Sequence, residues 1–150
     1  MKAFRFPLQR VLDARRHKED ARKKELAAAK QAELEAQERL RLLQDHSAEV
    51  RGELGCHVGR VFKASEMSLY YAYSQQLQHH IAQQEKVVTQ AAAIVAEKRE
   101  ALLASSKEKK ALEKLKERMK DRHLVETNRE EQTMLDEAAA RLGARKVSVS

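Results

Sequence analysis

The stretch Gly52–Ser65, with the sequence GELGCHVGRVFKAS, decides how this chain folds, because it holds three of the chain's four glycines. Glycine weakens a helix by about 1 kcal/mol relative to alanine and adopts left-handed conformations without steric cost. Long charged runs that contain no proline flank the stretch, over residues 8–51 and 66–142. The sequence therefore predicts a tip at which one long helix ends and a second helix turns back.

The composition favours long helices over a rounded domain. Charged residues make up 35% of the 150 residues and aromatic residues only 4%, with no tryptophan. This composition is typical of coiled coils, although a comparable charge density also occurs in disordered chains. Sustained helical periodicity of the apolar residues argues against disorder. We therefore predict an all-α fold, a single long antiparallel two-helix coiled-coil hairpin with a longer second helix.

The apolar residues form one narrow seam along each predicted helix. Helix one is expected at about 8–54, the tip at about 55–65 and helix two at about 66–142, with Ser65 as its N-cap. Gly143 then fits a helix stop, which leaves a disordered tail at 143–150. The steps of 3 and 4 between apolar residues are those of a coiled-coil seam. In helix one, the seam residues are Leu26, Ala29, Ala36, Leu40, Leu43, Val50 and Leu54. In helix two, they are Leu77, Ile81, Val88, Ala91, Val95, Leu102, Leu112, Leu115 and Met119.

The rise of a helix converts these ranges into a geometry. At 1.5 Å per residue, helix one is about 70 Å long and helix two about 115 Å. Folding at the tip places residue i opposite a residue near 123 − i, so residues 116–142 extend past the start of helix one. Residues 15–22 are mostly charged and offer little apolar surface to bury.

The net charge of +7 is concentrated at the open end of the hairpin. Residues 1–25 and 98–123 each carry a net charge of +5, and the fold brings the two segments together. A basic end of this kind could bind nucleic acid, an anionic membrane or an acidic protein.

The sequence carries no motif of an enzyme or a cofactor site. It lacks GxxxxGK[ST], GxGxxG, HExxH and CxxC, so we expect no catalysis, no cofactor and no metal. Cys56 is the single cysteine, which excludes an intrachain disulfide and fits a reducing cytoplasm. The longest apolar run, residues 91–96, is far shorter than the roughly 20 residues of a membrane helix. We expect neither a signal peptide nor membrane insertion.

Three stretches of the chain resemble the FliJ family of bacterial flagellar export proteins. The opening FRFPLQRVL begins at Phe4 and looks like the family's opening. ERLRLL at Glu38 and YYAYSQQL at Tyr70 are similar to its inner helical segments, and ETNREEQ at Glu126 with LDEA at Leu135 is similar to its closing pattern. The order of these motifs along the chain and the position of the tip carry the resemblance.

The resemblance implies a role in protein export. FliJ proteins are antiparallel two-helix coiled coils that resemble the rotor stalk of F-type ATPases. The family's partners would be the hexameric export ATPase, which the stalk stimulates, the membrane export gate and export chaperones. The protein would be cytoplasmic, at the inner-membrane export apparatus. Injectisomes use a similar stalk. The resemblance therefore implies the stalk architecture and leaves open whether the export system is a flagellum or an injectisome.

The resemblance also implies two docking regions. One is a patch for the gate and the ATPase, whose residues step by 4, 3 and 4 along each helix. It comprises Arg39, Leu43, His46 and Val50 in helix one, and Tyr73, Leu77, His80 and Gln84 in helix two. Paired across the hairpin, for example His46 with Leu77 and Val50 with Tyr73, their numbers sum to 123. The other region is the ATPase-ring end, with Phe4, Leu8, Leu12, Arg118, Arg129 and Leu135.

An alternative function is a basic coiled coil that binds nucleic acid or ribosomes. The charge would suit it, but the chain has few aromatic residues for stacking on bases and no known binding motif. Tight, salt-sensitive binding in a mobility-shift assay would favour this alternative. We expect no nucleic-acid partner.

Overall fold

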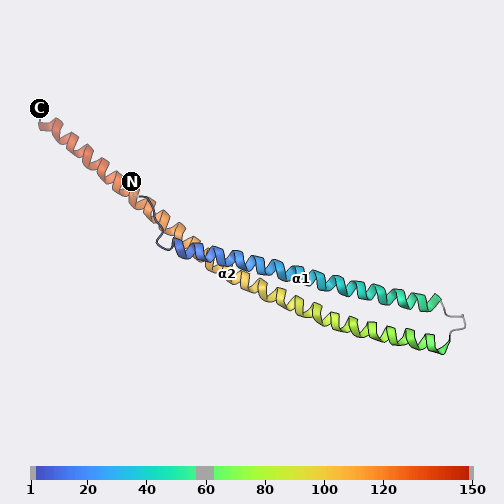
Figure 1. Cartoon of the computed structure of the whole chain (residues 1–150). Helices are drawn as coiled ribbons and strands as arrows, with labels where there is room; N and C mark the ends of the chain where they lie inside the picture. Colours follow the sequence, from blue (N-terminus) through green and yellow to red (C-terminus); the bar gives the residue numbers. More distant parts are fainter. Residues whose placement is uncertain (1–2, 57–62, 149–150) are drawn as a thin grey trace. The chain divides into compact units, whose positions relative to one another are not determined.

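The computed structural model describes residues 3–56 and 63–148 of the chain. These residues form two α-helices and no strand, α1 at Gln9–Cys56 and α2 at Ala64–Ser148 (Figure 1). The all-α prediction is confirmed, with the second helix the longer one. Most of the expected tip lies outside the described residues.

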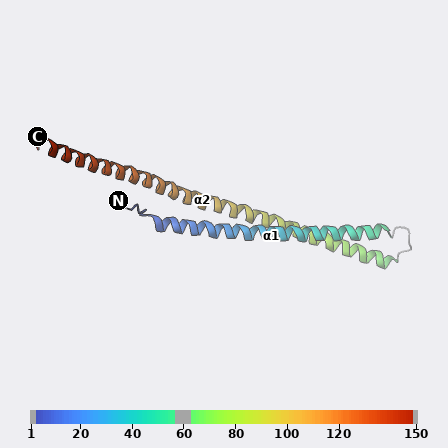
Figure 2. The same cartoon turned by 90° about the horizontal axis from the view of Figure 1, so that it is seen from above.

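The structure divides into two compact units. Asp20–Ala104 form one, here called the tip unit, and Met1–Glu19 with Ser105–Ser150 form the other, here called the terminal unit. Each unit contains a part of α1 and a part of α2. Within the tip unit the two parts lie side by side and run antiparallel (Figures 1 and 2).

The helices begin slightly away from the expected positions. Pro7, which has no backbone N–H, precedes the start of α1, and the N–H of Gln9 donates to the carbonyl of Phe6 at 3.2 Å. At the start of α2, the carbonyl of Lys63 accepts from the N–H groups of Glu66 at 3.0 Å and Met67 at 3.3 Å. Ser65 therefore lies inside the first turn of α2 and is not the N-cap that the sequence predicted.

The end of α2 differs more from the expectation. The helix continues through Gly143 to Ser148, whereas the sequence predicted a stop at Gly143 and a disordered tail. Gly143 keeps a helical backbone and so does not provide the left-handed cap that would end the helix. Arg145 and Lys146 lie in the last turn, where positive charge is favourable beside the helix C-terminus.

The seam of the tip unit follows an unbroken heptad pattern. Steps of 3 and 4 alternate along both helices, and every position on this pattern from Arg22 to Leu54 and from Tyr70 to Leu102 is buried or half-buried. Met67, the next position toward the start of α2, is 47% exposed. On α1 these positions are Arg22, Leu26, Ala29, Glu33, Ala36, Leu40, Leu43, Ser47, Val50 and Leu54. On α2 they are Tyr70, Ser74, Leu77, Ile81, Gln84, Val88, Ala91, Val95, Lys98 and Leu102.

Hydrogen bonds across the tip unit fix the register of the two helices. The amide of Gln84 donates to the carbonyl of Ala36 at 2.9 Å, and the amide of Gln78 donates to the hydroxyl of Ser47 at 3.2 Å. The residue numbers of these pairs sum to 120 and 125, close to the predicted 123. The sequence therefore predicts the register to within one helical turn.

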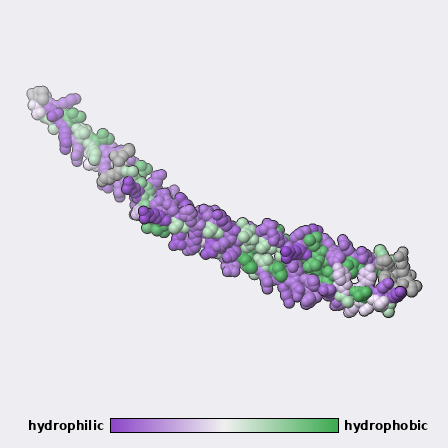
Figure 3. Space-filling model, viewed as in Figure 1, coloured by the Kyte–Doolittle hydropathy of each residue, from purple (hydrophilic) through white to green (hydrophobic). Residues whose placement is uncertain are grey.

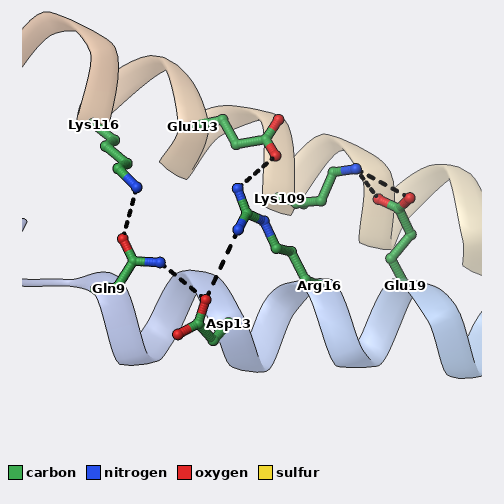
Figure 4. A network of polar contacts seen from close by, with 7 residues as sticks. All are labelled: Gln9, Asp13, Arg16, Glu19, Lys109, Glu113 and Lys116. Carbon is green, nitrogen blue, oxygen red and sulfur yellow. Dashed lines mark hydrogen bonds and ion pairs between the residues drawn. The ribbon is translucent and has the colours of Figure 1, made fainter.

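The terminal unit has a small apolar core followed by a buried ion pair. Leu12 is 0% exposed and Phe6 is 8% exposed, and the ammonium of Lys116 lies 6.0 Å from the centre of the Phe6 ring. Glu19 is only 4% exposed, and its carboxylate oxygens lie 2.9 and 3.1 Å from the Lys109 ammonium (Figure 4). Glu19 belongs to the charged stretch 15–22, which the sequence predicted to bury little surface. Its side chain nevertheless occupies the seam.

A polar network continues along the same face of the terminal unit. Lys116 donates to Gln9 at 2.8 Å, Gln9 donates to Asp13 at 2.9 Å, and Arg16 lies between Asp13 and Glu113 (Figure 4). Because water screens these partly exposed contacts, removing one partner should cost less free energy than removing Glu19 from the buried pair.

The packing in the terminal unit ends near Thr127. The heptad positions of α2 continue from Ser105 to His123, and the next half-buried residue, Thr127, follows after a second consecutive step of 4. Such a stutter moves the following residues off the seam. Every side chain from Asn128 to Ser148 is exposed, including Leu135 at 66% and Leu142 at 65%. The C-terminal part of α2, residues 128–148, is called the C-terminal segment below.

We predict that Glu19→Ala destabilises the protein by about 2–3 kcal/mol, because it leaves the partly buried Lys109 ammonium without its carboxylate. Urea denaturation followed by circular dichroism would measure this loss. Glu19→Leu combined with Lys109→Leu should regain the stability, since apolar residues can replace a buried pair. Arg41→Ala, which removes the exposed pairs with Glu38 and Asp45, is the matched control and should have a much smaller effect. Equal losses in Glu19→Ala and Arg41→Ala would contradict the prediction.

A second prediction concerns Glu25 in the tip unit. Hydrogen bonds from Arg22 at 3.0 Å and Lys98 at 3.3 Å hold the pKa of its carboxyl below the ordinary value of 4.5. A lowered folded-state pKa stabilises the protein above the unfolded-state value, and this stabilisation is lost as the pH falls through the folded-state pKa. The unfolding midpoints of the wild type and Glu25→Gln should therefore differ at pH 7 and converge in acid. An NMR titration of the carboxyl should show its pKa rising in Arg22→Gln, and an unchanged pKa in that variant would contradict the assignment.

Candidate docking surfaces

The heptad pattern divides the surface of the tip unit into two flanks. With the seam positions labelled a and d, the g positions precede a and the e positions follow d. In an antiparallel pair, the g positions of both helices meet on one flank and the e positions meet on the other. A hydrogen bond of 2.5 Å joins the g residues His46 and Tyr73, whose rings pack edge to face with centres 5.8 Å apart. This contact identifies the g flank.

Half of the residues in the predicted docking patch belong to the seam. Val50 and Leu77 are 8% and 7% exposed, and Leu43 and Gln84 are half-buried at heptad positions. Their side chains hold the two helices together and offer little surface to a partner. For these four, packing accounts for the pattern that the sequence analysis noted.

The other four residues of the patch share the g flank. Arg39, His46 and His80 are exposed, and Tyr73 is 43% exposed. The pairing differs from the expected one, because His46 contacts Tyr73 where the sequence predicted Leu77. Tyr73 precedes Leu77 by four residues, which is about one helical turn. Residues on a flank therefore face partners at a different sequence offset from residues in the seam. These four residues form the accessible part of the patch and are called the g-flank patch below.

The predicted ATPase-ring residues all lie in the terminal unit, and their exposure varies. Leu12 is completely buried, and Phe4 is half-buried with its ring centre 5.7 Å from that of His123. Leu8 is 37% exposed, and Leu135 in the C-terminal segment is 66% exposed. Arg118 and Arg129 are exposed as well. Leu12 therefore supports this region from within, while the others are accessible to a partner.

The structure also contains a pocket that the sequence analysis missed. A cavity of about 140 Å³ opens on the e flank of the tip unit, and its lining is mostly apolar. The lining residues are Val50, Arg51, Leu54, Met67, Tyr70, Tyr71 and Ser74. The heptad pattern could have suggested this pocket, because Ser74 is a small side chain at a seam position between larger ones.

Residues 3–56 and 63–148 contain no cluster of three or more His, Cys, Asp or Glu side chains that could hold a metal ion. No helix in this part of the chain combines the length and apolar character needed to cross a membrane. The face seen in Figure 3 is mostly hydrophilic, with hydrophobic residues gathered toward the tip end of the tip unit.

Comparison with known families identifies the chain. A family model described as the flagellar FliJ protein matches residues 4–148. The chain belongs to the FliJ family. This membership makes it a type III export-related protein, and the predicted resemblance to the FliJ family is confirmed.

Comparison with solved structures agrees with this fold. The FliJ-family chain is similar to a protein described as a YscO homolog, CT670 from Chlamydia trachomatis, with a TM-score of 0.61. The two sequences are 21% identical, and the match covers 93% of this chain and 95% of the other. No curated protein matches the sequence. The structural likeness supports the two-helix fold and does not extend to partners.

Proposed function

We propose that this FliJ-family protein is the stalk of a flagellar type III export apparatus. In this role it binds and stimulates the hexameric export ATPase, couples the ATPase to the membrane export gate and helps escort export chaperones. It would act in the cytoplasm at the inner-membrane export apparatus, without catalytic activity of its own. The observation that carries the proposal is the family match over residues 4–148, nearly the whole described chain.

The terminal unit supplies the surface for the ATPase in this proposal. Its C-terminal segment exposes Leu135 and Leu142 at one face of the helix, seven residues apart. Exposed apolar residues at heptad spacing favour packing against another helical or apolar surface. The basic residues that precede the segment, such as Lys120 and Arg122, are exposed and would attract an acidic surface.

The g-flank patch supplies the surface for the gate. Two imidazoles, a phenol and a guanidinium lie on this flank of the tip unit, so the patch combines aromatic area with hydrogen-bond donors. Tyrosine and arginine, two of the residue types in the patch, are enriched among the residues that dominate binding energy at protein interfaces. The four seam residues of the predicted patch would act indirectly, because their packing holds the g-flank residues in place.

If the terminal unit binds the ATPase through its C-terminal segment, a chain ending at Thr127 should keep its fold and lose ATPase stimulation. This truncation retains every buried or half-buried heptad position of the terminal unit. The melting temperature should change by only a few degrees, since surface changes away from packing contacts have small effects. Stimulation would be measured as the phosphate release of the purified export ATPase.

A full-length variant distinguishes the loss of the apolar contacts from the shortening of α2. Leu135→Ala with Leu142→Ala keeps the C-terminal segment helical and removes its apolar contacts, so stimulation should fall at least fivefold. Gln132→Ala with Glu137→Ala is the matched control on the same segment and should keep most of the stimulation. Full stimulation by the chain that ends at Thr127 would rule out the proposed role of the C-terminal segment.

The gate proposal predicts that Arg39→Ala, Tyr73→Ala and His80→Ala together weaken gate binding at least tenfold. All three positions are exposed on the g flank, so helicity and the melting temperature should remain close to those of the wild type. Calorimetric titration with the soluble domain of the gate protein would measure the affinity. Gln84 is left unchanged, because its amide bonds to the Ala36 carbonyl inside the seam.

The e flank provides the matched control for the gate experiment. Gln37→Ala, Gln44→Ala and Glu85→Ala change three exposed residues at e positions over a similar length of the tip unit. This variant should bind the gate as the wild type does. If both triple variants lose binding equally, or if neither does, the g-flank patch is not the docking surface.

A further inference from the structure

The pocket on the e flank of the tip unit lies apart from the surfaces assigned so far. The g-flank patch follows the opposite edge of the same pair of helices, as the His46–Tyr73 contact shows. The pocket lies at the end of the tip unit where α1 ends and α2 begins, between Val50 and Leu54 on α1 and residues 67–74 on α2. It is therefore a separate surface, which a second partner could bind at the same time.

The pocket lies beside a small seam residue on α2. Ser74 occupies a heptad position where the neighbouring positions hold Tyr70 and Leu77. Its small side chain leaves space on the e flank, and the space is walled by the apolar parts of Met67 and Tyr71. These two walls are themselves 47% and 69% exposed. An occupant would cover apolar surface that the two helices leave open to water.

The volume of the pocket limits what can bind. A cavity of about 140 Å³ is close to the roughly 150 Å³ of an apolar cavity that holds one benzene molecule. It therefore accepts a single phenylalanine or leucine side chain rather than the continuous face of a helix. A stable contact between two copies of the chain would need an interface of roughly 1,000 Å² or more, which one such anchor does not provide.

The charge of the pocket indicates the rest of the ligand. Arg51 is the charged residue among the lining side chains and is exposed. Its guanidinium forms no hydrogen bond or ion pair with another residue in the described ranges 3–56 and 63–148. A guanidinium beside an apolar cavity matches a carboxylate that adjoins an apolar anchor, because it can donate two parallel hydrogen bonds to one carboxylate.

We propose that the e-flank pocket is a docking site for an acidic peptide segment that inserts one phenylalanine or leucine between Met67 and Tyr71. The peptide's carboxylate pairs with Arg51, and its anchor fills the space that Ser74 leaves. The site is independent of the proposed contacts with the ATPase and the gate, and it would allow the tip unit to hold an acidic partner segment while the g flank is occupied.

Methionine methyl NMR on the full-length chain tests this proposal directly. The probe is the synthetic peptide EDEFEDE, titrated into protein labelled with ¹³C at the methionine methyl groups. The Met67 signal should shift and saturate, since its side chain lines the pocket. The signals of Met119 and Met134, which belong to the terminal unit, serve as internal controls and should remain unchanged.

Two further peptides separate the anchor from the charge. EDEAEDE lacks the aromatic side chain and should bind at least tenfold more weakly, while KKKFKKK keeps the anchor and should also bind at least tenfold more weakly. Equal binding of the first two peptides would show charge attraction alone and overturn the proposal. Absence of a Met67 shift with EDEFEDE would overturn it as well.

Variants of the chain complete the test. Arg51→Gln should weaken binding of EDEFEDE at least fivefold and reduce its dependence on salt. Ser74→Leu should fill the pocket and abolish the Met67 shift, and Tyr71→Ala, an exposed position, provides a second test if Ser74→Leu disturbs the fold. Tyr73→Ala on the g flank is the matched control and should bind normally. A Met67 signal that moves with protein concentration in the absence of peptide would identify a second copy as the occupant and refute the proposal.

Discussion

Each helix of this protein has one other helix against which it can bury apolar surface, and the rest of the structure depends on this constraint. A narrow seam of a and d positions therefore provides nearly all the burial, and several of those positions hold small or polar side chains. Only Leu12 is completely buried among the large side chains of the described residues. Because apolar burial is scarce, individual polar contacts across the seam have a large influence on register and stability.

The polar seam positions show how this influence works. Glu19 with Lys109 in the terminal unit, and Ser47 with Gln78 in the tip unit, satisfy each other only at one offset of the helices. A shift by one heptad that placed Leu102 where Lys109 lies would leave the buried Glu19 carboxylate without an ammonium partner, which costs more free energy than a small loss of apolar contact. Register specificity is a well-attested use of buried polar residues in coiled coils, and these pairs fit that use.

The same constraint explains why the candidate surfaces lie where they do. Two packed helices leave their flanks and any unpaired end open to solvent, so docking residues can occur at g or e positions or beyond the end of the packing. The g-flank patch, the e-flank pocket and the C-terminal segment occupy these three kinds of place. Val50, Leu77 and Leu12 show the limit of reading such surfaces from a helical spacing, because seam and flank residues share the same spacing of three and four.

The sequence by itself determined the helical fold, the register of the tip unit to within a turn and the resemblance to the FliJ family. These features follow from local propensity and from a repeat of seven that one chain displays without any partner, whereas Gly52 and Gly55, from which the sequence predicted the end of the first helix, lie inside α1. It could not separate the exposed members of the docking patch from the buried ones, nor show that Glu19 is buried or that Gly143 remains helical. Those properties, together with the pocket beside Ser74, were decided by the tertiary structure, because each depends on which side chain of the other helix lies opposite.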